Sequence, residues 1–119
     1  MDAASLSDAW EAKAAEWVAW ARTPGHDEFF ERLNWPAFVR ILPDARGATL
    51  DLGCGEGRSG RELAGLGHRV TGIDSSATLA RLAGEGGGYE RVACGAPGTA
   101  LEKAARQPYF LHLRCRLSR

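Results

Sequence analysis

Hydrophobic positions change their spacing near residue 47 of this 119-residue chain. In residues 8–21 apolar side chains recur every three or four positions, as on one face of a helix, and the segment opens on a D-x-x-E sequence typical of a capping box. The sequence RTPGH ends that helix, because proline and glycine interrupt helical structure. A second, less regular helical segment is expected over residues 27–41, where Pro36 can only open a helical turn. We therefore predict an N-terminal helical region over residues 1–46.

Short apolar runs alternate with helical segments over residues 47–95. Because the connections are short, the order strand, helix, strand, helix, strand indicates parallel strands joined by right-handed crossovers. The expected strands are 48–54, 68–74 and 89–95, and the expected helices are 57–67 and 76–84. The predicted fold class is α/β: the first three strands of a partial Rossmann-like, doubly wound parallel sheet, preceded by the helical region.

Residues 96–119 depart from this pattern. Residues 99–107 are compatible with a helix, and YFLHLRCRLSR, which begins at Tyr109, alternates apolar and basic residues as an edge strand does. Residues 1–89 hold nine of the 15 basic and 13 of the 15 acidic residues, so positive charge is in excess only toward the C-terminus. We treat this segment as an atypical tail with three interpretations: a frameshifted or truncated gene end, a native ending that completes a small sheet, or a basic arm that docks on nucleic acid or an acidic partner.

Composition narrows the function classes. Hydrophobic residues make up 45% and charged residues 25%, with zero net charge, as in one small globular domain. The three cysteines lack metal-ligand spacing, so neither a disulfide framework nor a metal site is expected. No apolar run approaches the roughly 20 residues of a membrane span. The acidic N-terminus is unlike a targeting peptide, so the expected location is the cytoplasm.

The candidate chemistry lies where the first strand ends. The sequence LDLGCGEG places Gly53, Gly55 and Gly57 directly after that strand, where a side-chain-free backbone can turn sharply or touch a ligand. Asp74 ends the next strand, so its carboxylate is expected beside the same crevice. There its two oxygens can accept hydrogen bonds from the hydroxyls of a ribose. This combination predicts a nucleoside cofactor without identifying it.

One interpretation of the loop is a dinucleotide site. Residues 55–60 match G-x-G-x-x-G, the pattern of NAD(P)-binding oxidoreductases. The register is poor, however, because the first glycine after the strand is Gly53, and the third glycine would then fall on Arg58. Asp51 at the strand end would also repel a diphosphate. An NAD(P)-binding fragment is therefore kept as an alternative.

The other interpretation is a resemblance. LDLGCGEG resembles the D-x-G-x-G-x-G motif of class I S-adenosylmethionine-dependent methyltransferases, and VTGIDSS resembles their second-strand acidic motif. Residues 8–94 as a whole are similar to the N-terminal part of small bacterial enzymes of this type. The resemblance implies the strand order 3-2-1-4-5-7-6, S-adenosylmethionine as cofactor, and methyl transfer to a small-molecule acceptor. It does not imply a nucleic-acid partner.

The resemblance also assigns residues by position. Asp51 would orient the methionine amino group directly or through water, Asp74 would bind the ribose hydroxyls, and Ser75 would lie next to the adenine. Catalysis by alignment and desolvation requires no universal catalytic residue, so the catalytic residues stay unassigned. The implied cofactor-binding residues are Asp51, Gly53, Gly55, Gly57, Asp74 and Ser75.

Other side chains are expected to pack or to be solvated. His26, Asp27, Glu31 and Trp35 could line an acceptor pocket, although packing or a turn explains each of them more simply. Cys54 is expected to be a small packed side chain, and the tryptophans are expected in core or lid packing. The arginines expected to be solvated surface charges are Arg58, Arg61, Arg69 and Arg81.

The resemblance weakens after the third strand. GAP stands at residues 95–97 in place of the usual GDA-like turn, and no apolar strand opened by aspartates follows. With only strands 3, 2 and 1 assigned, the first strand is expected to be an unprotected sheet edge. The crevice would then have one wall, with weak cofactor binding and little or no turnover.

Overall fold

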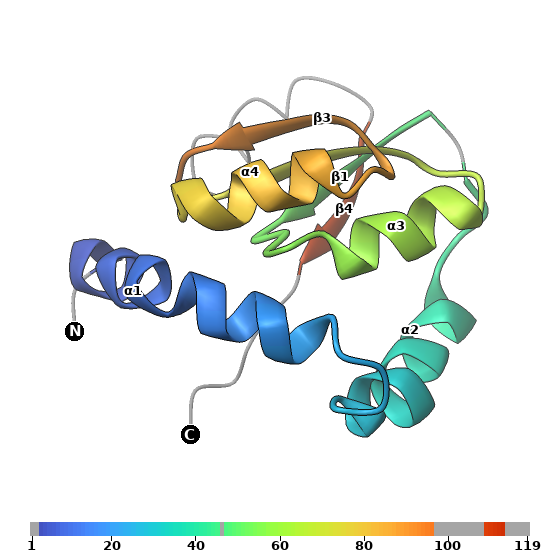
Figure 1. The fold of residues 1–119 in the computed structure, drawn as a ribbon. Helices are drawn as coiled ribbons and strands as arrows, with labels where there is room; N and C mark the ends of the chain where they lie inside the picture. The colour runs from blue at the N-terminus through green and yellow to red at the C-terminus, as the bar shows by residue number, and fades with distance from the viewer. Residues whose placement is uncertain (1–2, 46, 97–108, 114–119) are drawn as a thin grey trace.

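Four parallel strands form one sheet in the order β3-β2-β1-β4 in the computed structural model, which describes residues 3–45, 47–96 and 109–113. The sheet is open, with β3 at one edge and β4 at the other (Figure 1). The strands are β1 (Ala48–Leu52), β2 (Arg69–Asp74), β3 (Tyr89–Cys94) and β4 (Tyr109–Leu113). The three predicted parallel strands are therefore confirmed, with ends that differ from the prediction by one or two residues.

The fourth strand corrects one expectation. β4 pairs with β1 in parallel register, from Ala48 opposite Tyr109 to Leu52 opposite Leu113. The prediction that β1 would be an unprotected edge is wrong, because β4 occupies that edge. The interpretation of the segment from Tyr109 as an edge strand is confirmed, and the order matches the first four strands that the resemblance implies. The helix expected over 99–107 and the basic side chains of the tail lie outside the described residues.

Two helices cover one face of the sheet. α3 (Arg58–Gly65) and α4 (Ala77–Glu85) both pack against β2 and β3. Side chains alternate along β1, so Thr49 and Asp51 point toward the helices, while Leu50 and Leu52 pack with Ile73 on the other face. The core on the helix side includes Leu63 of α3, Val70 of β2, and Leu79 and Ala83 of α4.

The N-terminal region is helical, as predicted. α1 (Ala3–Ala21) begins a few residues before the expected start and packs against α4 (Figure 1). A π-helical turn, η1 (Phe30–Asn34), leads directly into α2 (Trp35–Ile41). Pro36 lies in the first turn of α2, where its missing N–H costs no helical hydrogen bond. The aromatic ring of Trp35 contacts those of Phe30 and Phe38 along this segment.

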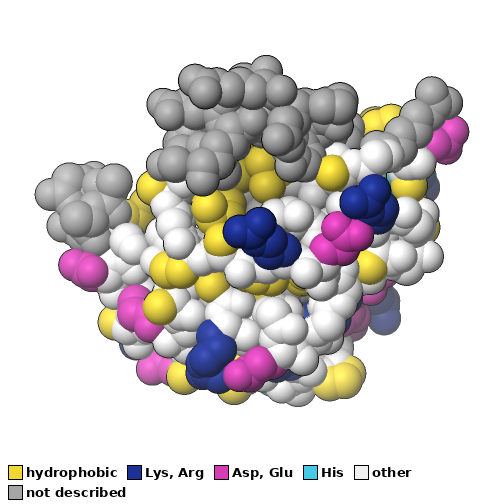
Figure 2. Space-filling model, turned by 90° about the horizontal axis from the view of Figure 1, so that it is seen from above, with side chains coloured by type: hydrophobic (Ala, Val, Ile, Leu, Met, Phe, Trp, Pro, Cys, Tyr) yellow, Lys and Arg dark blue, Asp and Glu magenta, His cyan; other side chains and the backbone are white. Residues whose placement is uncertain are grey.

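The surface of the described part of the chain carries mixed charge. Figure 2 shows basic and acidic side chains interspersed over one face, without a large block of either sign. Arg69 pairs with Glu90 and Arg81 pairs with Glu85 on exposed surface, which confirms these two arginines as surface charges. Within residues 3–45, 47–96 and 109–113, no helix has the length and apolarity of a membrane span, and no metal-ligating cluster of three or more side chains is found.

Candidate functional site

A glycine loop connects β1 to α3. Gly53, Gly55 and Gly57 all have positive φ angles, of 69°, 58° and 97°. Residues with a side chain pay about 1–2 kcal/mol in this left-handed region, which explains the use of glycine. The N–H groups of Gly53 and Cys54 both donate to the carbonyl of Ile73, at 2.8 and 3.0 Å. The loop is therefore fixed to the carboxyl end of β2.

Asp74 completes that attachment. Its Oδ2 accepts a hydrogen bond from the N–H of Gly55 at 2.8 Å, and its Oδ1 accepts one from the N–H of Ser76 at 2.9 Å. Asp74 is only 8% exposed. Each carboxylate oxygen has two lone pairs, so both oxygens can accept a further hydrogen bond. The carboxylate thus lies where it was predicted, with a role in holding the loop that sequence reasoning missed.

The three loop glycines differ in their surroundings. An added Cβ at Gly53 or Gly55 would meet nothing within 4 Å, so both face open space. Gly57 is buried instead, and an added Cβ would lie 3.0 Å from the ring of Tyr89 and 3.1 Å from the backbone of Ala83. The structure therefore brings the first two glycines to the open surface and places the third in packing between α3 and α4.

The other predicted residues occupy different depths. Ser75 is exposed directly after β2, beside Asp74. Cys54 is 1% exposed, which confirms it as a packed side chain. Asp51 is fully buried beneath the loop, and the hydroxyl of Tyr89 donates to its Oδ2 at 2.7 Å. Asp51 therefore has no surface from which to touch a ligand directly.

A buried carboxylate inside the loop was not predicted. Glu56 is 2% exposed and accepts hydrogen bonds from Arg22 at 2.8 Å and from Arg61 at 2.8 and 2.9 Å. Burial acts to raise the pKa of Glu56, but the hydrogen bonds from the two guanidinium groups hold that pKa below its usual value. Arg22 directly follows the last residue of α1, and Arg61 lies in α3. The two ion pairs of Glu56 therefore connect the glycine loop to α1 and to α3.

The expectation that Arg58 and Arg61 of α3 are solvated surface charges is wrong, because both form ion pairs with partly or fully buried carboxylates. Arg61 is held by Glu56, as above. Arg58 pairs with Asp27 at 2.5 Å, and its guanidinium lies 3.8 Å from the ring centre of Phe30 and 5.3 Å from that of Trp17. Sequence spacing could not reveal these contacts, because Asp27 and Trp17 belong to the separate N-terminal region.

α1 also contacts the start of α4. Glu11 accepts hydrogen bonds from the hydroxyl of Ser76, from the hydroxyl of Thr78 and, at 3.2 Å, from the N–H of Thr78. The bond from Ser76, followed by that from Thr78, lowers the pKa of Glu11. Ser7 adds a hydroxyl bond to the carbonyl of Ser75 at 3.4 Å. α1 is therefore bound to the segment that directly follows Asp74.

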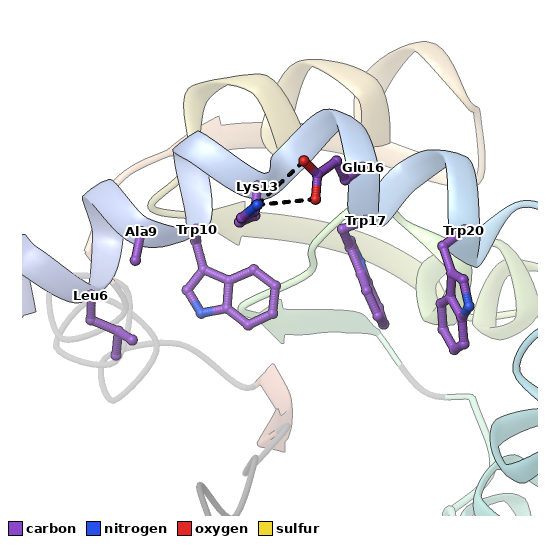
Figure 3. A pocket seen from close by; sticks show the side chains of 7 residues that line it. All are labelled: Leu6, Ala9, Trp10, Lys13, Glu16, Trp17 and Trp20. Carbon is purple, nitrogen blue, oxygen red and sulfur yellow. Dashed lines mark hydrogen bonds and ion pairs between the residues drawn. The ribbon is translucent and has the colours of Figure 1, made fainter.

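An apolar pocket of about 660 Å³ runs along α1. Three tryptophans on one side of the helix point into it, and an ion pair between Lys13 and Glu16 lies beside them (Figure 3). Trp17 stacks on Trp20 and meets Trp10 edge-on. The described lining residues are Leu6, Ala9, Trp10, Lys13, Glu16, Trp17 and Trp20.

The four residues suggested for an acceptor pocket do not line this one. His26 lies in the turn after α1, and its ring centre is 6.0 Å from that of Trp20. Asp27 is bound to Arg58, and Trp35 packs between two phenylalanines. Glu31 lines a separate hollow with Arg22 and Arg61. Packing and ion pairing thus account for the positions of His26, Asp27 and Trp35.

Comparison with protein families matches residues 50–108 to the family described as "Methyltransferase domain". The match covers the loop, Asp74 and β3, and it continues past Ala96 into the segment that was expected to be atypical. A search of curated proteins found no match.

Solved structures with similar folds include complexes with SAM and with SAH. The "DhpI-SAM-HEP complex" has 30% sequence identity and a TM-score of 0.58, and it aligns with 76% of this chain and 42% of that one. The "DhpI-SAH complex structure" has 31% identity and a TM-score of 0.54, over 71% of this chain and 41% of that one. A TehB-like SAM-dependent methyltransferase from Corynebacterium glutamicum has 31% identity over 74% of this chain and 44% of that one, with a TM-score of 0.49. The chain thus spans less than half the length of these proteins.

The strand order, the glycine loop and the family match agree with one another. The strand bounds place Gly53, Gly55 and Asp74 at the carboxyl ends of β1 and β2, which is the ligand-binding edge of an open parallel sheet, and the family match includes all three residues. Over residues 50–108 the chain matches the methyltransferase domain, and its fold is that of the N-terminal part of S-adenosylmethionine-dependent methyltransferase structures.

Proposed function

We propose that this chain binds S-adenosylmethionine between the glycine loop and the end of β2, and that it transfers the methyl group to a small-molecule acceptor. The observation that carries the proposal is the contact between Asp74 and Gly55, which aligns a carboxylate with an open loop surface. The complexes of DhpI with SAM and with SAH support the same cofactor.

The residues present fit this ligand. Gly53 and Gly55 leave the loop surface free of side chains, and the Asp74 oxygens retain lone pairs for two ribose hydroxyls. Ser75 lies exposed next to Asp74, where the adenine is expected. When bound, the cofactor would supply an electrophilic methyl group on a sulfonium. The chain's own part is to bind, align and exclude water from the reacting atoms.

The electrostatics of the loop favour this cofactor over a dinucleotide. Asp51 is a fully buried carboxylate beneath the loop. A negative charge there attracts the ammonium and sulfonium groups of S-adenosylmethionine, whereas it would repel the diphosphate of NAD(P). The dinucleotide alternative therefore has less support, and the basic-arm alternative depends on side chains outside the described residues.

The tryptophan pocket on α1 is the proposed place for the acceptor. Its volume of about 660 Å³ lies within the roughly 300–1,000 Å³ of small-molecule sites, and aromatic lining is typical of such sites. Trp17 joins it to the cofactor loop, because Arg58, which follows Gly57, contacts the Trp17 ring. An apolar acceptor with a flat ring system suits this lining.

The three-part division of the chain is also a proposal: a helical region over 1–46, the cofactor-binding half over 47–95, and a tail over 96–119. The pairing of β4 with β1 supports the interpretation that the tail completes the sheet. Translating the other two reading frames downstream of the Gly95 codon tests the frameshift interpretation, which requires an aspartate-opened apolar strand in one of them.

Calorimetry of the purified chain with S-adenosylhomocysteine and with NAD⁺ tests the cofactor. We expect saturable binding of S-adenosylhomocysteine only, and binding of NAD⁺ alone would reject the proposal. Transfer of a labelled methyl group from S-adenosylmethionine to a panel of aromatic small molecules then tests the acceptor. Replacement of Trp10 by Ala should weaken the binding of any compound that is methylated, while leaving the affinity for S-adenosylhomocysteine unchanged.

A further inference from the structure

The ring of Tyr89 fills a slot that three glycines create. Tyr89 begins β3, and its ring crosses over β2 at Gly72, where an added Cβ would lie 2.7 Å from the ring. An added Cβ at Gly60 of α3 would lie 2.0 Å from the ring, and one at Gly57 would lie 3.0 Å from it. No side chain larger than hydrogen fits at Gly60 or Gly72 unless the tyrosine moves. The ring is therefore held between the sheet and α3.

The slot directs the hydroxyl of Tyr89 to Asp51 on β1. The donor and Oδ2 are 2.7 Å apart, and Asp51 is fully buried. Burial, and then the neighbouring charge of Asp51, raise the pKa of Tyr89 above its ordinary value. The hydroxyl therefore keeps its proton and remains a donor. A hydrogen bond of this kind fixes the orientation of a carboxylate and favours its charged form.

We infer that Tyr89 is a positioning residue that holds the Asp51 carboxylate, charged and oriented, beneath the glycine loop for the amino-acid end of the bound ligand. The inference rests on the proposed function. Because Asp51 has no exposed surface, it acts on the ligand's ammonium group through its charge or through an intervening water. The adenine and ribose lie beside Asp74 instead, so Tyr89 acts on one end of the ligand only.

Two ligands separate these ends. S-adenosylhomocysteine carries the amino acid, whereas 5′-methylthioadenosine has the same adenine and ribose with a methyl group in its place. Tyr89→Phe keeps the ring in its slot and removes only the hydroxyl. We expect the dissociation constant of Tyr89→Phe for S-adenosylhomocysteine to rise about tenfold, and that for 5′-methylthioadenosine to stay within about twofold of the wild-type value.

The outcomes distinguish the two proposals. If the wild-type chain binds neither ligand, the proposed function fails and the inference fails with it. If the wild-type chain binds but Tyr89→Phe weakens both ligands equally, or neither, only the inference is overturned. Asp51→Asn provides a second variant in case Tyr89→Phe does not fold, and it must lower the preference for S-adenosylhomocysteine in the same way. In the double variant the loss should equal that of Asp51→Asn alone, because Tyr89 acts on the ligand only through the Asp51 charge.

Discussion

The carboxylate of Asp74 binds the N–H of Gly55 at 2.8 Å, although 19 positions separate the two residues in the chain. The last residue of β2 thereby sets the position of the loop that leaves β1. Asp74 has two tasks as a result, since it supports the loop and is proposed to bind the ribose. Substitutions at this position should change both stability and affinity.

Replacement of Asp74 by Ala should lower the free energy of unfolding by about 3 kcal/mol, because the buried N–H of Ser76 and the part-buried N–H of Gly55 lose a charged acceptor. Affinity for S-adenosylhomocysteine should fall more than about tenfold. Denaturant unfolding and calorimetry measure the two effects. Asp74→Asn keeps one acceptor oxygen and should lose about half as much stability. Asp44→Ala, at an exposed loop position, is the control and should change stability by less than about 0.5 kcal/mol.

Gly55→Ala tests the open surface of the loop. Its φ of 58° costs a side chain about 1–2 kcal/mol of stability, and the new methyl group would project into space that the ligand is proposed to fill. Gly25→Ala is a matched control, since Gly25 has a φ of 81° and equally free surroundings in the turn after α1. Both variants should lose similar stability, but only Gly55→Ala should bind S-adenosylhomocysteine more weakly. Equal affinity in the two variants would contradict the site.

Gly60→Ala tests the tyrosine slot. Alanine normally stabilises a helix relative to glycine by about 1 kcal/mol, but here its Cβ would overlap the ring of Tyr89. We expect a net loss of about 1–3 kcal/mol in thermal or denaturant unfolding. Gly65→Ala on the same helix meets nothing within 4 Å and should be neutral or stabilising. A stabilised Gly60→Ala variant would show that the ring does not occupy the slot.

Glu56 should make the free energy of unfolding depend on pH in the acidic range. Burial opposes ionisation, but the hydrogen bonds from Arg22 and Arg61 bring the folded-state pKa below the ordinary 4.5. The unfolded chain then binds a proton at higher pH than the folded chain does. The stabilisation is complete above about pH 4.5 and is lost as the pH falls through the folded-state pKa.

Urea unfolding of Glu56→Gln at a series of pH values between about 3 and 7 measures this contribution. The variant should be less stable at neutral pH, and its unfolding free energy should fall less steeply in acid than that of the wild type. Glu11 also has a lowered pKa, so part of the acid dependence will remain in the variant. Glu16→Gln, at a side chain that is 74% exposed, is the control. An unchanged slope in Glu56→Gln would show that the ion pairs do not form.

The features that the sequence predicted well are those that depend on neighbouring residues. Gly53 and Gly55 require a backbone that only glycine adopts easily, and Asp74 ends an apolar run, so both motifs are visible within a few positions. The place of Pro36 in the first turn of α2 follows from the same kind of local rule. These rules located the loop and the carboxylate before their contact was known.

The missed features join distant parts of the chain. The Tyr89 hydroxyl reaches Asp51 across 38 positions, and Arg22 reaches Glu56 across 34. Nothing local marks a glutamate as the partner of two arginines or a glycine as the floor of a tyrosine slot. The pairing of β4 with β1 was only one of three interpretations of the tail, because the usual acidic opening of that strand is lacking. Such contacts become visible only when the sheet and helices are placed in space.

The tethers of α1 have a consequence for the order of folding. α1 precedes the residues that hold it, because Glu56 and Ser76 lie 34 and 65 positions after Arg22 and Glu11. Closing loops of that length is entropically costly, and contacts of high sequence separation slow folding. α1 therefore cannot dock until β2 and the start of α4 have been synthesised. During that interval its tryptophans are the apolar surface that a chaperone would bind.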